Sequence, residues 1–231
     1  MQRKISRNIS LLKESISNAS LKANIDPNQI ALIAVSKKKS NESIKAALDL
    51  GILNFGENYA QELAMKAEFF KNNNIGWHFI GPIQTNKIKL IAKHANWVHS
   101  LDRVKVIDKF NKECVALNKQ MNALIQVNIS GEETKSGIKP DNLLEFADYV
   151  NLQSNIILKG IMVLPRITSS IKETGIEMSK AKKLHTLLVD KYPHASNLSM
   201  GTTSDFECAI KYGSNMIRVG ELIFGKRKRK K

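Results

Sequence analysis

The feature that most constrains the fold is a regular alternation of short apolar segments with longer helical ones. Eight segments have the length and the β-branched or aromatic content of buried strands. They are residues 31–36, 52–55, 77–80, 97–99, 123–129, 158–163, 197–200 and 216–219. Helices are predicted between them, at 41–50, 58–71, 84–93, 102–119, 140–150, within 170–191 and at 205–212, with a short one after the last strand.

Alternating βα units imply a parallel sheet. Eight such units within 231 residues predict a (β/α)₈ TIM barrel, preceded by an N-terminal helix at residues 4–24. An open doubly wound sheet is the alternative, and the absence of a G-x-G-x-x-G fingerprint makes it the less favoured one. We therefore expect a single barrel domain over residues 1–225, followed by a disordered basic tail at 226–231.

The net charge of +15 suggests nucleic-acid binding at first sight. Six of the positive charges lie in residues 226–231, which leaves +9 for the first 225 residues. The other basic residues are scattered, and no zinc finger or RNA-binding motif accompanies them. We predict a solvated tail with weak attraction to polyanions and no specific nucleic-acid partner.

Cysteine content and hydropathy indicate the compartment. Cys114 and Cys208 are too few for a disulfide framework, and the five histidines form no recognised metal-ligand spacing with them. The N-terminus lacks the uninterrupted apolar stretch of a secretion signal, and no apolar run reaches about 18 residues. These observations predict a cytoplasmic protein without a membrane span or a metal site.

A lysine ends the first predicted strand, in the segment Ala31-Leu32-Ile33-Ala34-Val35-Ser36-Lys37. Ile33, Val35 and Lys37 share one face of that strand, whereas Lys38 falls on the other. An amine held against apolar surroundings has a lowered pKa and becomes a usable nucleophile. Lys37 is the candidate nucleophile, and a surface lysine just beyond a strand is the alternative.

Small and hydroxyl-bearing residues follow the last two strands, at 200–205 and 219–221. Barrels of this class commonly bind a phosphate in these two loops, through helix N-termini. Ordinary N-capping is the alternative for either loop alone. Arg218, on the last strand, is either a ligand-binding residue or an ion-pair partner. A reactive lysine, a phosphate site and an arginine in one barrel mouth suggest a phosphate-bearing carbonyl compound such as pyridoxal 5′-phosphate (PLP).

Several motifs resemble one family. They are Ala34-Val35-Ser36-Lys37, Phe55-Gly56-Glu57-Asn58-Tyr59-x-Gln61-Glu62, Trp77-His78-Phe79-Ile80-Gly81-Pro82-Ile83-Gln84-x-Asn86-Lys87, Lys135-Ser136-Gly137, Leu198-Ser199-Met200-Gly201, Arg218-Val219-Gly220 and Ile223-Phe224-Gly225. In this order, from about residue 5 to 225, they are similar to the pyridoxal phosphate homeostasis protein (YggS/PROSC) family. The fold of that family resembles the N-terminal barrel domain of alanine racemase.

The resemblance implies a set of cofactor-binding residues. Lys37 would carry PLP as an internal aldimine, Arg218 would face the pyridine nitrogen, and Asn58 would lie beside the ring. The phosphate would be held by Ser199, Gly220 and the backbone of Glu221. Thr203, the last residue of Gly201-Thr202-Thr203, would add a hydroxyl to this cofactor-binding set.

Two positions depart from the family pattern. Family members often have Thr where this chain has Glu221, so we expect that carboxylate to turn outward while its N–H still donates. Where the family has Gly-Met-Ser, this chain has Gly201-Thr202-Thr203, which keeps a hydroxyl at the last position. We expect an altered phosphate affinity and the same binding mode.

The residues and the resemblance both favour a carrier over an enzyme. Arg218 beside the pyridine nitrogen would disfavour its protonation and weaken the ring as an electron sink. A racemase needs a second base, which alanine racemase takes from a C-terminal domain of its partner subunit. This chain ends about where that domain would start, and Tyr59 alone among its tyrosines lies near a predicted strand end.

We therefore expect a PLP-binding protein in intracellular PLP homeostasis, with no catalytic residues. Its role would be buffering or delivering the cofactor, held as a Schiff base on Lys37, and PLP-dependent apoenzymes are candidate partners. Lacking the contacts to a partner domain, the chain is expected to be a monomer. The alternative is a low-activity monomeric PLP-dependent amino-acid racemase.

Overall fold

The computed structural model describes residues 2–132, 134–166 and 171–226. Its strands are β1 (Ala31–Val35), β2 (Asn54–Glu57), β3 (Gly76–Phe79), β4 (Trp97–Leu101), β5 (Met121–Val127), β6 (Ile156–Val163), β7 (Asn197–Ser199) and β8 (Met216–Val219). The α-helices are α1 (Gln2–Lys22), α2 (Asn41–Leu48), α3 (Ala60–Phe69), α4 (Ile88–His94), α5 (Val104–Ala116), α6 (Leu143–Asn151), α7 (Ile171–Lys191), α8 (Phe206–Lys211) and α9 (Glu221–Phe224). Short 3₁₀ helices cover Pro27–Gln29, Thr85–Lys87 and Pro140–Asn142.

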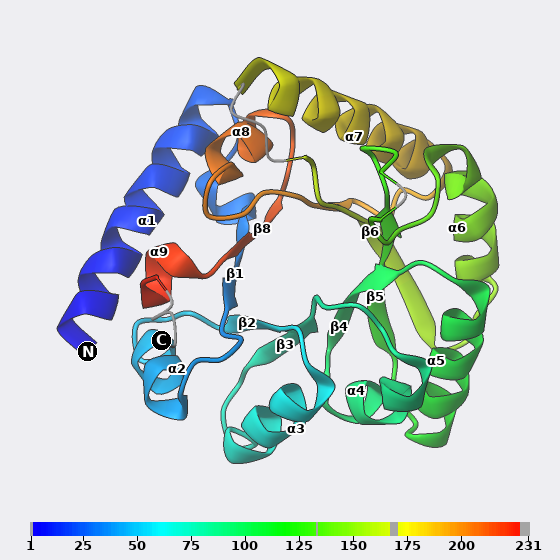
Figure 1. Cartoon of the computed structure of the whole chain (residues 1–231), viewed down its shortest axis with the longest axis horizontal. Helices are drawn as coiled ribbons and strands as arrows, with labels where there is room; N and C mark the ends of the chain where they lie inside the picture. The colour runs from blue at the N-terminus through cyan, green and yellow to red at the C-terminus, as the bar shows by residue number, and fades with distance from the viewer. Residues whose placement is uncertain (1, 133, 167–170, 227–231) are drawn as a thin grey trace.

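The strands form one closed barrel in chain order, each parallel to its neighbours, with the helices around it (Figure 1). β8 pairs with β1, Arg218 opposite Ile33, and this pairing closes the sheet. The (β/α)₈ barrel expected from the sequence is therefore confirmed, and the open-sheet alternative is wrong. Because the strands are parallel, their carboxyl ends meet at one end of the barrel, which we call the mouth.

Side chains alternate between the inside of the barrel and the layer beneath the helices. A small cluster of Ile33, Leu124, Met162 and Met216 fills the interior and is almost completely buried. Residues of the opposite parity, such as Ala34, belong to the larger core that the helices cover. Lys37 therefore follows β1 with the parity of Ile33, which points into the barrel.

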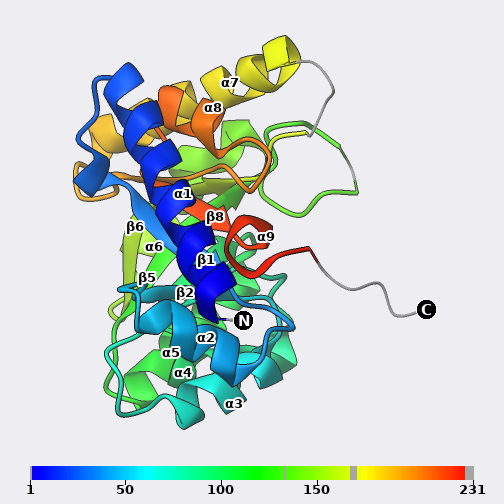
Figure 2. The same ribbon diagram turned by 90° about the vertical axis from the view of Figure 1, so that its left-hand side faces the viewer.

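The N-terminal helix α1 packs across α2, α8 and α9 on the outside of the barrel (Figures 1 and 2). Its apolar stripe recurs every three to four residues, and Ile5, Ile9, Leu12 and Ile16 are all buried. The helix therefore covers the seam where the last strand meets the first.

Two predicted strands are displaced along the chain by two residues: the one at 123–129, which forms β5 at Met121–Val127, and the one at 52–55. Residues 52–55 were predicted as extended, whereas β2 runs from Asn54 to Glu57. The reason is the end of α2: Gly51 turns the chain with a φ of +80°, and the Ile52 N–H donates back to the Ala47 carbonyl at 3.1 Å. As a consequence Glu57 belongs to the strand and is completely buried.

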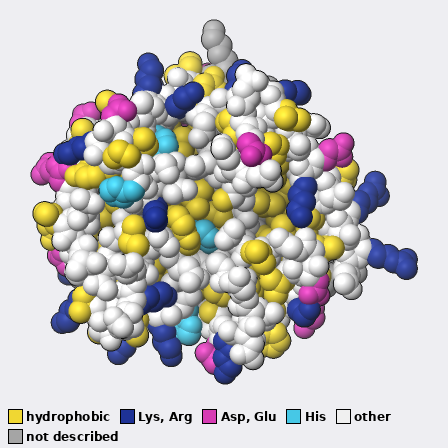
Figure 3. Space-filling model, turned by 180° about the vertical axis from the view of Figure 1, so that it is seen from behind, with side chains coloured by type: hydrophobic (Ala, Val, Ile, Leu, Met, Phe, Trp, Pro, Cys, Tyr) yellow, Lys and Arg dark blue, Asp and Glu magenta, His cyan; other side chains and the backbone are white. Residues whose placement is uncertain are grey.

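The basic residues do not gather on the face of the barrel seen in Figure 3, where Lys and Arg side chains are scattered among acidic ones. Of the predicted tail, only Lys226 lies within the described residues. Among the helices of the described chain, none combines the length and the apolarity needed to cross a membrane.

Candidate functional site

The seven predicted site residues lie on or just after four neighbouring strands at the mouth. Lys37 comes two residues after β1 and Asn58 directly after β2, while β8 and its loop carry Arg218, Gly220 and Glu221. β7 and the loop after it carry Ser199 and Thr203. Since the barrel order is β7-β8-β1-β2, all seven belong to one continuous arc of the mouth.

Lys37 lies in a sharp turn at the end of β1. The Ser36 N–H still pairs with the Gly56 carbonyl of β2 at 3.0 Å, and Lys38 then adopts a left-handed backbone with a φ of +59°. Lys37 is half-buried. The side chains of the next two residues go elsewhere, because the Lys38 amine lies over the Tyr59 ring and the Lys39 amine donates to the Gly225 carbonyl.

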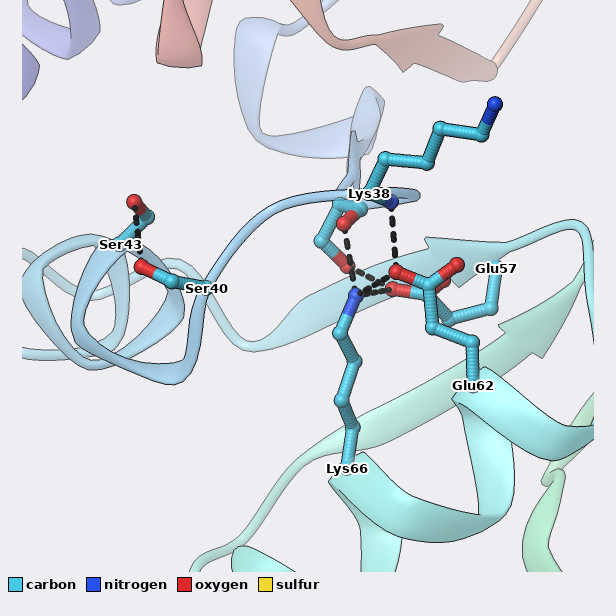
Figure 4. Close-up of polar contacts among 7 residues, drawn as sticks. Lys38, Ser40, Ser43, Glu57, Glu62 and Lys66 are labelled. Atoms are coloured by element: carbon cyan, nitrogen blue, oxygen red, sulfur yellow. Dashed lines mark hydrogen bonds and ion pairs between the residues drawn. The ribbon is translucent and has the colours of Figure 1, made fainter.

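A buried lysine of α3 binds the same turn from below (Figure 4). Lys66 is 5% exposed as a residue, and its amine donates to the Ser36 carbonyl at 2.8 Å and pairs with Glu57 Oε1 at 2.8 Å and Glu62 Oε1 at 2.7 Å. The Ser36 hydroxyl donates to Glu57 Oε1, and the Lys38 N–H donates to Glu62 Oε1, both at 2.5 Å. We call these five residues the Lys66 clamp.

Glu57 is the most buried carboxylate of the Lys66 clamp. Burial raises its pKa above the ordinary value, and the charge of Lys66 opposes that shift. Its Oε2 is buried and lacks a hydrogen-bond partner within the described residues. The ion pair with Lys66 therefore offsets much of the free-energy cost of burying this carboxylate.

Arg218 lies inside the barrel at the end of β8 and is 5% exposed. Its Nη1 donates to Ser199 Oγ at 2.5 Å, and its Nη2 donates to the Val163 carbonyl at 3.1 Å. Burial lowers its pKa to about 10, with Asp205 opposing the shift. The guanidinium is still charged at neutral pH and is fixed in orientation by two strands.

A hydrogen-bonded chain runs from Arg218 through the barrel interior. Ser199 Oγ lies 3.0 Å from His99 Nδ1, His99 Nε2 lies 2.9 Å from His78 Nδ1, and His78 Nε2 lies 3.2 Å from Asn54 Oδ1. Because Asn54 Oδ1 only accepts, His78 must carry its proton on Nε2, and each later link then has one donor and one acceptor. We call Asn54, His78, His99, Ser199 and Arg218 the interior chain.

Both histidines of the interior chain are held neutral. Burial lowers the pKa of His78 to about 3. Burial also holds the pKa of His99 well below its ordinary value, and protonated His99 would in addition be repelled by the charge of Arg218 and by His78 if that were protonated too. The Ser199 hydroxyl, completely buried, is engaged by His99 and Arg218. The predicted contact of Ser199 with a phosphate stays a prediction, and in this structure its hydroxyl bonds to Arg218 and His99.

The neutral histidines predict that the fold loses stability in acid. Below their unfolded pKa of about 6.5 the unfolded chain binds protons that the folded chain does not, until His78 itself titrates near 3. From pH 7.5 to 5.5 the free energy of unfolding should fall by about 1.4 kcal/mol for each histidine. Urea unfolding of the parent and of a His78→Gln/His99→Gln variant at both pH values checks this, and parallel losses in the two proteins would contradict it.

A cavity of about 240 Å³ opens at the mouth. Of the seven predicted site residues, all within the described chain, only Asn58 lines this cavity, together with residues such as Gly81, Gln126, Lys135 and Leu164. Asn58 Oδ1 is buried and makes no hydrogen bond within the described part of the chain. A buried amide oxygen without a partner, on the wall of a cavity, is suited to a bound ligand.

The two loops predicted to bind phosphate lie next to each other and next to β1. Thr202 donates to Asp205 Oδ1 through both its N–H and its hydroxyl, at 2.7 and 2.8 Å, which shapes the turn before α8. Thr203 is half-buried, and the side chain of Glu221 is exposed. A Cβ on Gly220 would lie 3.1 Å from the Val35 carbonyl, so the chain passes close to the end of β1 here.

Sequence reasoning missed four buried polar residues: His78 and His99, which face into the barrel, and Glu57 and Lys66, which meet between the barrel and α3. A usable signal was present for the two histidines, since each occupies an alternate position of a short strand whose other residues are apolar. Lys66 carried no such signal, because its surroundings depend on how α3 docks against β1 and β2. Within the ranges described, no group of three or more His, Cys, Asp or Glu residues could hold a metal ion.

Comparisons with known proteins cover nearly the whole chain. The family described as alanine racemase, N-terminal domain, matches residues 5–228. The pyridoxal phosphate homeostasis protein of Haemophilus influenzae is 40% identical over 227 residues, which cover 96% of each chain. An unknown protein from Bifidobacterium adolescentis has a similar crystal structure, with a TM-score of 0.90 and 28% identity over 96% of this chain and 95% of that one. PipY of Synechococcus elongatus PCC7942, solved with PLP bound, has a TM-score of 0.82 and 26% identity over 96% of this chain and 100% of that one.

Proposed function

Since this chain belongs to the pyridoxal phosphate homeostasis protein family, we propose that it binds PLP as a Schiff base on Lys37 and buffers or delivers the cofactor in the cytoplasm. The observation that carries the proposal is the position of Lys37, which is half-buried at the mouth, just after β1, the strand that lies between β8 with Arg218 and β2 with Asn58. The PLP bound to the related PipY supports it.

The residues of the arc fit the chemical groups of PLP. The ring would lie against Asn58, whose buried Oδ1 lacks a partner within the described residues, and the pyridine nitrogen would face Arg218. The phosphate would bind at Thr203 and at the backbone N–H groups of Gly220 and Glu221, where the exposed Glu221 carboxylate need not approach it. When bound, PLP supplies an aldehyde that condenses with an amine.

Lys37 would supply that amine. Its nitrogen attacks the aldehyde carbon, and the carbonyl oxygen leaves as water with two protons that the nitrogen gives up, so the attachment is reversible by hydrolysis. A reversible bond suits a protein that stores a reactive aldehyde and releases it again. Apoenzymes that require PLP are the proposed recipients.

Arg218 favours storage over catalysis. A cation fixed beside the pyridine nitrogen disfavours protonation of that nitrogen, and an unprotonated ring withdraws electrons less effectively from a bound amino acid. The interior chain and the Val163 carbonyl hold the guanidinium in place. We therefore propose a carrier without catalytic residues, acting as a monomer.

Titration of the purified protein with PLP, followed by visible absorption, tests the proposal. We expect a saturable yellow band at one cofactor per chain, transfer of that cofactor to an added PLP-dependent apoenzyme, and no racemisation of alanine or other amino acids. A protein that forms no band would refute the binding function. Racemisation at an enzymatic rate would contradict the proposed carrier function and support the alternative, a PLP-dependent amino-acid racemase.

Arg218→Met should weaken binding even where no covalent bond can form. Hydrogen bonds to charged groups contribute about 1.5–3 kcal/mol, so the dissociation constant for pyridoxine 5′-phosphate, which lacks the aldehyde, should rise about 10- to 150-fold. Calorimetric titration measures it. Arg7→Met, on the exposed face of α1, is the matched control. Equal affinities in the parent and the Arg218 variant would place Arg218 outside the binding site.

A further inference from the structure

The two peptide groups that flank Lys37 are held by two side chains of one helix. On α3, Lys66 donates to the Ser36 carbonyl at 2.8 Å, and Glu62 accepts from the Lys38 N–H at 2.5 Å (Figure 4). Glu62 and Lys66 are four residues apart and are themselves paired at 2.7 Å. The helix therefore binds the chain on both sides of Lys37 as one unit.

The buried charges of this arrangement cost more free energy of folding than a contact that only joins a helix to a sheet requires. The side chain of Lys66 is 6% exposed and that of Glu57 is completely buried, and removing such charges from water opposes folding. An apolar residue would fill the same space between α3 and the strands without that penalty. In addition, Lys38 is held in a left-handed backbone that residues with a Cβ rarely adopt. What the charges provide is a fixed conformation of the turn.

We propose that Glu62 and Lys66 are positioning residues for Lys37, an inference that rests on the proposed function of that lysine. Glu62 fixes the peptide after Lys37, and Lys66 fixes the peptide before it. Together they hold the backbone from which the Lys37 amine reaches the mouth. In this proposal neither side chain touches the cofactor. Both affect its binding only by fixing the backbone of the turn that carries Lys37.

The proposal predicts a loss that is specific to covalent binding. A loose turn spreads the Lys37 amine over many positions, which weakens attachment of an aldehyde and leaves the contacts of the ring and the phosphate intact. PLP and pyridoxine 5′-phosphate share the ring and the phosphate, and only PLP carries the aldehyde. Comparing the dissociation constants of the two ligands therefore distinguishes a misplaced Lys37, which weakens PLP alone, from a damaged binding site, which weakens both.

Glu62→Ala is the test variant, because Lys66 keeps Glu57 and the Ser36 carbonyl as partners and no buried charge is left unpaired. In the unliganded protein, amide hydrogen exchange at Lys38 should become about tenfold faster or more. The dissociation constant for PLP, read from the visible band, should rise about tenfold, while that for pyridoxine 5′-phosphate stays at the parent value.

Two further variants complete the experiment. Glu62→Gln keeps an oxygen that can accept from the Lys38 N–H, and it should recover part of both losses. Glu68→Ala removes an exposed carboxylate of the same helix that pairs with Lys71, and it should match the parent in every measurement.

The proposal is overturned if Glu62→Ala binds PLP as tightly as the parent, or if both ligands are weakened equally, because Glu62 would then act on the site or the fold as a whole. Unchanged exchange at Lys38 would overturn it as well. Failure of the proposed function is a different result, in which the parent itself forms no band with PLP.

Discussion

Lys37→Ala should abolish the visible absorption band that forms when the protein is mixed with PLP. The reason is chemical: the band requires an amine bonded to the aldehyde, and the turn after β1 brings Lys37 into the arc that contains Arg218 and Asn58. Binding of pyridoxine 5′-phosphate should persist, because the proposed ring and phosphate contacts come from other residues. Absorption and calorimetric titrations of the parent and the variant measure the two effects.

The neighbouring lysines are the controls for this experiment. Lys38 lies over the Tyr59 ring, and Lys39 donates to the Gly225 carbonyl, so Lys38→Ala and Lys39→Ala should keep the band. A band that survives in Lys37→Ala with the parent's intensity would show that another amine binds the aldehyde. Loss of the band in all three variants would indicate that the turn, and no particular amine, is required.

Lys66→Met should destabilise the protein by about 3–5 kcal/mol, the typical effect of removing one partner of a buried ion pair. The variant leaves the completely buried Glu57 carboxylate without its cation and leaves the Ser36 carbonyl without its donor. Urea unfolding at pH 7.5, followed by far-ultraviolet circular dichroism, measures the free energy of unfolding.

A compensating substitution distinguishes the lost charge pair from lost packing. In Lys66→Met/Glu57→Gln no buried charge remains, and the Ser36 hydroxyl can still donate to the amide oxygen, so most of the stability should return. The loss of unfolding free energy in Lys66→Met should also become smaller in mild acid. Burial raises the pKa of Glu57 in the folded state, so the folded protein takes up a proton more readily than the unfolded chain and gains stability as the pH falls. Destabilisation below about 1 kcal/mol in the single variant would mean that the clamp charges are solvated.

Much of the fold could be predicted from the sequence, because alternating strands and helices that number eight leave few topologies open. The displacement of the strand predicted at residues 52–55 has a local cause. Ile52 reads as the start of a strand by its apolar side chain, but its N–H closes the end of α2. Hydrophobic pattern alone does not distinguish a residue that caps a helix from one that begins a strand.

The placement of the seven predicted site residues along one arc could also be predicted, since parallel strands bring their carboxyl ends together, while their roles stay predictions. What the pattern did not reveal is how those residues are supported. Ser199 was predicted to hold the phosphate, and its inward parity on the short strand β7 brings its hydroxyl to Arg218 and His99. His78 and His99 are 21 residues apart in sequence and meet only because β3 and β4 are neighbours.

Borohydride reduction of the protein incubated with PLP locates the attachment site directly, since it converts the reversible bond into a stable one that survives digestion and mass spectrometry. Saturating and then removing excess cofactor before reduction limits labelling of exposed lysines. We predict one modified residue per chain, in the peptide that contains Lys37. Modification spread over several lysines, or concentrated on one other than Lys37, would contradict the proposed binding of PLP at the end of β1.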